Sequence, residues 1–134
     1  MIVVDTNVIA YLYLEGDRSS QVEQLLEKDT QWVAPLLWRS EFRNVLALYI
    51  RKGRLTLDQA QQIMSEATLL MQGREYGVVS IRVLELVASS GCSAYDCEFV
   101  ALAEDLGTSL VTVDKKILDE FPQVAVSLDD VVAS

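Results

Sequence analysis

Short apolar runs alternate along the chain with stretches in which apolar residues recur at helical spacing. The first run, residues 2–4, is unbroken and β-branched, which is typical of a strand buried on both faces. We expect strands at residues 2–4, 32–34, 76–79, 110–113 and 124–126. We expect helices at residues 8–14, 19–28, 36–52, 56–71, 81–88, 93–106 and 114–121, with a short tail from residue 127. Because strands that alternate with helices pair in parallel, the pattern predicts an α/β fold, with a central, mostly parallel sheet of four or five short strands flanked by helices.

Length and composition narrow the class of protein. The chain has 134 residues and no internal repeat or linker, which predicts one domain over residues 1–134. It carries 11 basic and 20 acidic residues, a net charge of -9, which argues against a protein that coats duplex nucleic acid. It has no histidine, which excludes Ser-His-Asp and Cys-His catalysis and histidine-based zinc sites. Any chemistry must therefore come from carboxylates, hydroxyls, amines or a metal ion.

The cysteines and the apolar runs bear on location. Cys92 and Cys97 are the only cysteines, and no second thiol pair or histidine completes a zinc site with them. We interpret them as two buried thiols in a reducing compartment. No secretory signal follows Met1, and the longest apolar runs are far too short to span a membrane. We expect a soluble, cytoplasmic protein.

The acidic residues divide into two groups. Most are expected on the polar faces of helices, where solvent surrounds them, including Glu23, Glu27, Asp29, Glu66, Glu98, Glu104 and Asp105. Four fall where burial is expected, and we refer to them as the four candidate carboxylates: Asp5, Glu41, Asp96 and Asp114.

Three of the four candidate carboxylates have an ordinary structural alternative as helix caps. Asp5 and Asp114 each end an expected strand, and ligands bind at that edge of open parallel sheets. Either could instead cap the helix that follows. Asp96 lies on the inward stripe of the 93–106 helix, but Ser93 and Asp96 also have capping-box spacing.

Glu41 is the most informative of the four. Leu37 and Val45 flank it at helical spacing, so it lies in an apolar stripe. A glutamate there is costly unless it is paired or binds a metal. The alternative is a buried ion pair with an arginine such as Arg39 or Arg43.

The arrangement of the four candidate carboxylates indicates a metal site. Two end parallel strands at one edge of the sheet, and two enter from inward helix faces, so the four would repel one another without a cation. Sites made of carboxylates alone suit Mg²⁺ or Mn²⁺. Such an ion can activate water and bind a phosphodiester oxygen, which is chemistry that needs no histidine.

Two other acid-based phosphate enzymes fit less well. A phosphotransfer receiver needs an aspartate at the end of a middle strand, where this chain has Ser80. A haloacid-dehalogenase-type phosphatase needs D-x-D after its first strand, where this chain has Asp5-Thr6-Asn7 and lacks the general acid.

Four segments together resemble the PIN-domain ribonucleases and, more narrowly, the VapC-like toxins of bacterial and archaeal toxin–antitoxin pairs. They are the start IVVDTN at 2–7, Ser40-Glu41, SAYDCEFVALAE at 93–104 and VTVDKK at 111–116. The resemblance covers essentially the whole chain. It implies a PIN-like fold and a Mg²⁺- or Mn²⁺-dependent endoribonuclease that leaves a 5′-phosphate and a 3′-hydroxyl.

The resemblance also assigns roles to residues. The four candidate carboxylates match the family's acidic set, with Asp5 and Asp96 expected as direct metal ligands and the other two as ligands through water or to a second ion. Asn7 and Thr112 match supporting polar positions. Asn7 would orient either a metal-bound water or a carboxylate, and Thr112 would form a hydrogen bond with Asp114 or with a metal-bound water. A further acid sometimes present after Asp114 is absent here, which weakens a second metal site.

Basic residues and partners complete the expectation. We expect local phosphate contacts from Arg39, Arg43, Lys115 and Lys116, with ordinary surface charge as the alternative. The resemblance implies a homodimer and a small antitoxin that extends across the active site. Residues 8–14 and 46–50 are apolar beyond one face, so they are candidate partner surfaces or core. A silent PIN-like binding module, or a nuclease of this fold without an antitoxin, stays open.

Overall fold

The computed structural model describes all of residues 1–134 and contains a five-stranded sheet in the order β3-β2-β1-β4-β5. The strands are β1 (Ile2–Val4), β2 (Trp32–Pro35), β3 (Glu75–Tyr76), β4 (Leu110–Thr112) and β5 (Ala125–Ser127). Every neighbouring pair is parallel, with Val3 in register with Val33 on one side and Leu110 on the other. The predicted parallel α/β sheet is confirmed.

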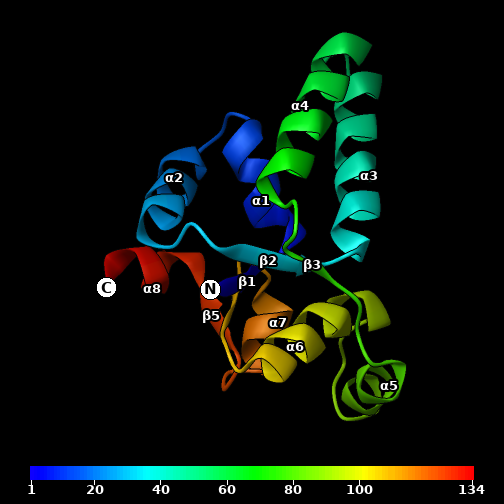
Figure 1. Ribbon diagram of the computed structural model, residues 1–134, viewed down its shortest axis with the longest axis vertical. Helices are drawn as coiled ribbons and strands as arrows, with labels where there is room; N and C mark the ends of the chain where they lie inside the picture. The colour runs from blue at the N-terminus through cyan, green and yellow to red at the C-terminus, as the bar shows by residue number, and fades with distance from the viewer.

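Helices cover both faces of this sheet. They are α1 (Thr6–Tyr13), α2 (Ser19–Lys28), α3 (Leu37–Arg51), α4 (Leu57–Leu70), α5 (Ser80–Ala88), α6 (Ala94–Leu106), α7 (Lys115–Glu120) and α8 (Leu128–Ala133). As viewed in Figure 1, α1 to α4 lie above the sheet and α5 to α7 below it. The α3 and α4 helices pack side by side and project away from the sheet (Figure 1). No helix is both long and apolar enough to cross a membrane.

The α6 helix is the central helix of the lower layer. Residues 99–103 are all buried, so α6 is apolar around most of its circumference rather than along one stripe. It packs against β1, β2 and β4, and α5 covers its outer side. The first turn of α6, which carries Asp96, is therefore fixed relative to the strand ends.

Two elements differ from the prediction. The predicted strand 76–79 is wrong beyond Tyr76, because the neighbouring strand β2 ends at Pro35, which pairs with Tyr76, and leaves no partner further on. The predicted short tail from residue 127 is also wrong: Ser127 ends β5 and its hydroxyl caps α8 by accepting from the Asp130 N–H at 3.1 Å. Leu128 is fully buried and anchors that helix.

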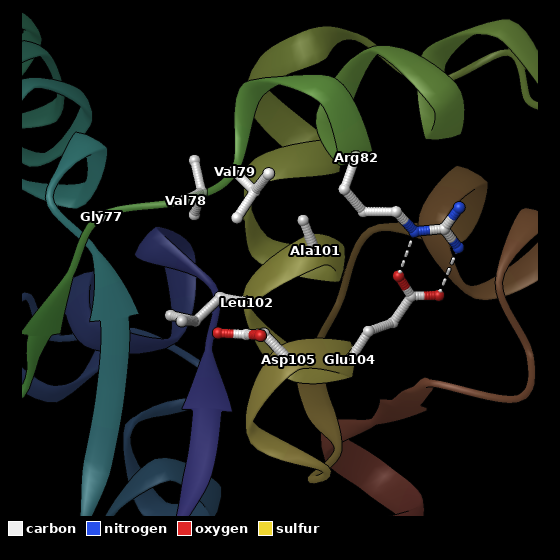
Figure 2. A pocket seen from close by; sticks show the side chains of 8 residues that line it. All are labelled: Gly77, Val78, Val79, Arg82, Ala101, Leu102, Glu104 and Asp105. Atoms are coloured by element: carbon white, nitrogen blue, oxygen red, sulfur yellow. Dashed lines mark hydrogen bonds and ion pairs between the residues drawn. The ribbon is translucent and has the colours of Figure 1, made fainter.

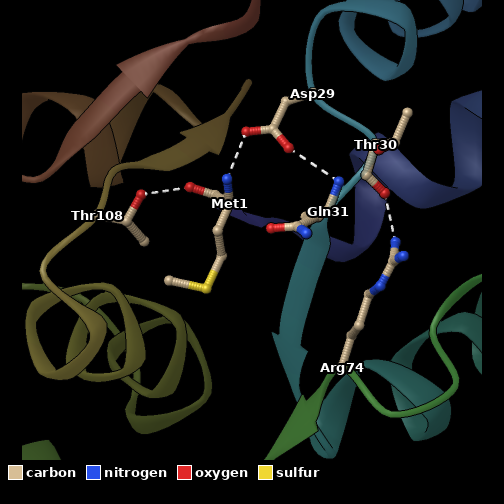
Figure 3. Close-up of polar contacts among 6 residues, drawn as sticks. All are labelled: Met1, Asp29, Thr30, Gln31, Arg74 and Thr108. Carbon is tan, nitrogen blue, oxygen red and sulfur yellow. Dashed lines mark hydrogen bonds and ion pairs between the residues drawn. The ribbon is translucent and has the colours of Figure 1, made fainter.

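Polar contacts tie the amino ends of the strands together (Figure 3). The Met1 ammonium lies 2.8 Å from Asp29 Oδ2, and Thr108 Oγ1 donates to the Met1 carbonyl at 2.7 Å. Arg74 donates to the Thr30 carbonyl beside them. The four candidate carboxylates lie at the opposite, carboxyl edge of the sheet.

Candidate active site

The carboxyl ends of β1 and β4 form the point where the chain reverses direction across the sheet. From β1 the chain proceeds outward to β2 and β3, and it then returns to β4 on the other side of β1. Ligands of open α/β sheets bind in the crevice at such a point. The structure brings the four candidate carboxylates together there in a pocket of about 250 Å³, which we call the acidic pocket. Its lining residues are Asp5, Thr6, Asn7, Glu41, Asn44, Val45, Asp96 and Asp114.

Asp5 precedes α1 but does not cap it through its side chain. Its Oδ2 accepts a 2.7 Å hydrogen bond from Thr112 Oγ1 instead. Thr112 is fully buried, and the same hydroxyl accepts from the Asp114 N–H at 3.0 Å. The predicted partner of Thr112 was Asp114 or a metal-bound water. The structure shows that Thr112 Oγ1 accepts from the Asp114 backbone N–H, while the carboxylate it binds is that of Asp5.

Asp114 is a helix cap, as its structural alternative predicted. Its Oδ1 accepts from the Lys116 N–H at 2.9 Å and from the Ile117 N–H at 3.1 Å. These bonds use one oxygen and orient the carboxyl group into the acidic pocket, which Asp114 also lines. Capping and metal binding are therefore compatible at this residue.

Glu41 is held by a hydroxyl rather than by an arginine. Thr6 Oγ1 donates to Glu41 Oε1 at 2.7 Å, and Thr6 is buried in the first turn of α1. The alternative of an ion pair with Arg39 is wrong, because the Arg39 guanidinium binds both oxygens of Glu75. Arg43 forms no salt bridge either, so Glu41 has no cationic partner in the protein.

Asp96 enters the acidic pocket from the first turn of α6. Ser93 caps this helix by accepting from the Asp96 N–H at 3.1 Å. The return bond from the Ser93 N–H to the Asp96 carboxylate, which would complete a capping box, is absent. The cap therefore uses the backbone of Asp96 and leaves its carboxylate in the pocket.

Burial and mutual repulsion raise the pKa of three of the four candidate carboxylates. Burial is the largest cause for Asp5, Glu41 and Asp96. The negative charges of Asp96 and Asp114 further raise the pKa of Asp5, and that of Asp114 raises the pKa of Asp96. None of the four forms a salt bridge. The pocket concentrates negative charge without a paired cation, although the positive ends of α1, α6 and α7 face it.

The donors in the acidic pocket fit a hard divalent cation. All are carboxylate, hydroxyl or amide oxygens, which Mg²⁺ and Mn²⁺ prefer. No group of three or more His, Cys, Asp or Glu side chains is arranged closely enough to hold a metal ion by itself. Mg²⁺ does not require such a group, because that ion keeps several of its waters and takes only one or two carboxylates directly.

The sequence reasoning missed two residues that line this pocket and one acidic residue whose charge acts on Glu41. Thr6 follows Asp5 and holds Glu41, and Asn44 lies three positions after Glu41 on the same helix face. The prediction that Glu98 lies on a solvated face is wrong, because Glu98 is half-buried and burial raises its pKa. Its negative charge also raises the pKa of Glu41, in addition to the larger effect of burial. Its position within the apolar run of α6, between Cys97 and Phe99, was the available signal.

The predicted phosphate contacts separate into two sets. Arg39 is occupied by Glu75, and Arg43 lies in a different pocket, between α3 and α4. Lys115 and Lys116 are exposed, form no salt bridge and directly follow Asp114. Asn7 is exposed and lines the acidic pocket.

A second pocket, of about 200 Å³, is lined by the 77–79 segment, by Arg82 of α5 and by the second half of α6 (Figure 2). Its polar feature is the paired Arg82 and Glu104, whose Nε and Oε1 atoms are 2.8 Å apart. It contains none of the predicted site residues. The acidic pocket is therefore the candidate active site.

Comparisons with known proteins agree with this geometry. A family model of the PIN domain matches residues 2–125. Ribonuclease VapC3 of Pyrobaculum aerophilum is 31% identical over 124 residues, which cover 90% of this chain and 95% of that protein. PAE2754 from Pyrobaculum aerophilum has the same fold, with a TM-score of 0.78 and 18% identity over 98% of this chain and 86% of that chain.

Two further structures share the fold. FitAcB from Neisseria gonorrhoeae has a TM-score of 0.74 and 18% identity, covering 95% of this chain and 96% of that chain. A toxin–antitoxin complex from Klebsiella pneumoniae has a TM-score of 0.68 and 16% identity, covering 96% and 98%. The chain therefore belongs to the PIN-domain family, among its VapC-like members.

Proposed function

We propose that this protein is a Mg²⁺- or Mn²⁺-dependent endoribonuclease, the toxin of a toxin–antitoxin pair, that cleaves RNA to leave a 5′-phosphate and a 3′-hydroxyl. The observation that carries the proposal is the acidic pocket, where four candidate carboxylates meet at the reversal point of the sheet without a paired cation. The relationship to Ribonuclease VapC3 supports the choice of RNA as substrate. A cytoplasmic location fits an RNA substrate and two free thiols.

Asp5 and Asp96 are the proposed direct ligands of the ion, and Glu41 and Asp114 the ligands through water. A bound Mg²⁺ or Mn²⁺ would supply Lewis-acid activation of water and of the scissile phosphate. Thr112 and Thr6 fix the carboxylates of Asp5 and Glu41 by 2.7 Å hydrogen bonds, so each presents its second oxygen to the pocket in a set orientation.

The two asparagines of the acidic pocket are proposed to orient polar groups of the substrate or water. Asn7 lies in the first turn of α1 and Asn44 on α3, and both line the pocket. The side-chain amide of each can donate and accept hydrogen bonds. Lys115 and Lys116 are the proposed phosphate contacts beside them.

An antitoxin partner is supported by the toxin–antitoxin complex among the structures of this fold. Residues 8–14 belong mostly to the core, since Val8, Ile9, Ala10 and Leu14 are buried. Leu48 and Ile50 stay exposed near the end of α3, and they are the better candidates for an antitoxin or homodimer surface. A basic antitoxin side chain would complement the acidic pocket.

RNA cleavage in the presence of Mg²⁺ or Mn²⁺ tests the proposal, with wild type compared with Asp5→Asn. Asp119→Asn is the matched control, because it removes an exposed carboxylate outside the pocket. We expect cleavage by wild type and Asp119→Asn that is lost in EDTA and in Asp5→Asn. Wild type that is inert toward varied RNAs, or Asp5→Asn as active as wild type, would contradict the catalytic assignment and favour a binding module.

A further inference from the structure

Gly91 lies in the loop between α5 and α6, two residues before the cap of α6, and a side chain there would press on the ends of two neighbouring side chains. A Cβ at this position would lie 3.1 Å from Lys116 Cε, 3.3 Å from Lys116 Nζ and 3.3 Å from Glu120 Oε1. The Gly91 N–H donates to the same Glu120 oxygen at 3.2 Å. Its φ is not positive, so the backbone itself does not require glycine. The glycine is explained by the Lys116 side chain that lies over it.

Lys116 connects this loop to the acidic pocket. Its backbone N–H donates to Asp114 Oδ1 at 2.9 Å, so its side chain begins next to a carboxylate that lines the pocket. Its ammonium forms no salt bridge, whereas the guanidinium groups of Arg39 and Arg82 are paired with carboxylates. Lys116 is therefore a cation without a salt bridge, two positions along the chain from Asp114 of the acidic pocket.

Building on the ribonuclease function proposed above, we infer that Gly91 is a positioning residue for substrate binding. Its missing side chain lets Lys116 lie across the loop, where the ammonium contacts a phosphate of RNA bound at the acidic pocket. The acidic pocket repels a polyanion such as RNA. A lysine attracts phosphate as a point charge, so the strength of this attraction depends on where the ammonium is held. The loop therefore determines the place of that charge.

Gly91→Ala tests the inference without threatening the fold. The atoms that a Cβ would displace are the ends of two flexible side chains, so the loop can stay in place while the ammonium moves. We expect the KM for RNA to rise by at most about fivefold while kcat changes less, since the loss of a whole exposed charge contact has this magnitude and the added Cβ only displaces the ammonium. Gly16→Ala is the matched control, because no atom lies within 4 Å of its added Cβ.

A double-variant cycle shows whether Gly91 acts through Lys116. We expect Lys116→Ala to raise KM at least as much as Gly91→Ala, and Gly91→Ala/Lys116→Ala to match Lys116→Ala alone. RNA binding in EDTA, followed by fluorescence anisotropy at several salt concentrations, gives a readout independent of cleavage. Lys116→Ala should reduce the salt slope by about 1, because one phosphate contact is lost, and Gly91→Ala should reduce it by part of that amount.

The outcomes are distinguishable. Inert wild-type protein contradicts the ribonuclease function, and the anisotropy series still reports on Lys116 and Gly91. Active wild type with an unchanged KM and salt slope in Gly91→Ala overturns the positioning role. A further loss when Gly91→Ala is added to Lys116→Ala also overturns it, because Gly91 would then act through the loop itself.

Discussion

Thr112 Oγ1 donates a 2.7 Å hydrogen bond to Asp5 Oδ2, and so joins two residues that are 107 positions apart in the chain. The same hydroxyl accepts from the Asp114 N–H at 3.0 Å. β1 and β4 are neighbours in the sheet, with Val4 in register with Val111, so this one buried side chain links the ends of both strands. The relative position of two of the four candidate carboxylates depends on it.

Thr112→Val should destabilise the protein and reduce cleavage. Valine keeps the shape and the strand propensity of threonine but leaves Asp5 Oδ2 and the Asp114 N–H without this partner. Leaving such buried groups unpaired costs about 1–3 kcal/mol, which urea unfolding can measure. Cleavage rates under saturating Mg²⁺ should fall as well, since the Asp5 carboxylate loses its fixed orientation.

Thr112→Ser is the control for this change, because serine keeps the hydroxyl and loses only a methyl group. It should retain most of the cleavage activity. Equal activity in the valine and serine variants would show that the hydroxyl does not orient the site.

Local sequence signals were sufficient for the positions of the candidate carboxylates. Asp5 and Asp114 follow short β-branched runs that β1 and β4 contain, and sheet topology then brings their ends together. Glu41 stood out because it interrupts an apolar stripe. These signals depend only on residues nearby in the sequence, so they can be recognised without knowledge of the tertiary structure.

The partners of those carboxylates could not be predicted in the same way. The bond from Thr6 to Glu41 joins residues 35 positions apart, and either hydroxyl or arginine would have satisfied the sequence pattern. The pairing of Arg39 with Glu75 depends on β3 lying beside the start of α3. Long-range packing decides between such alternatives, and one sequence does not contain that information.

Arg39 is expected to affect stability rather than RNA binding. Its guanidinium binds both oxygens of Glu75, which also accepts from Trp38 Nε1 at 2.7 Å, so the pair connects α3 to β3. Arg39→Gln should lower the melting temperature and leave the KM for RNA unchanged. Glu75→Gln should lower it similarly. A raised KM in Arg39→Gln but not in Glu75→Gln would mean that Arg39 contacts RNA.

Cys92 and Cys97 should react slowly with thiol reagents in the folded protein. Cys92 directly precedes the N-cap residue of α6, and Cys97 lies four positions after that residue. Apolar side chains at these two positions commonly pack against each other at the start of a helix. Both are buried and free, and burial raises the pKa of each thiol, so little thiolate forms. Alkylation should be fast only in urea. A Ser20→Cys variant, with its new thiol exposed on α2, should add one rapidly alkylated group. Rapid native alkylation of wild type would contradict this burial.

Asp5→Asn should stabilise the metal-free protein at neutral pH. Burial is the main reason that the pKa of Asp5 is raised above its ordinary value of 3.8 in the folded state. The folded state thus holds this proton more tightly than the unfolded chain, so its contribution to stability is full below about pH 4 and is lost as pH rises through the raised pKa. Asparagine removes the charge and can still accept from Thr112. In EDTA the melting temperature of Asp5→Asn should exceed that of wild type at neutral pH, and the difference should shrink toward about pH 4.

Added Mg²⁺ should raise the melting temperature of wild type more than that of Asp5→Asn, because the ion binds the folded state through this carboxylate. Parallel pH profiles for the two proteins would contradict the assignment of a raised pKa to the Asp5 carboxylate.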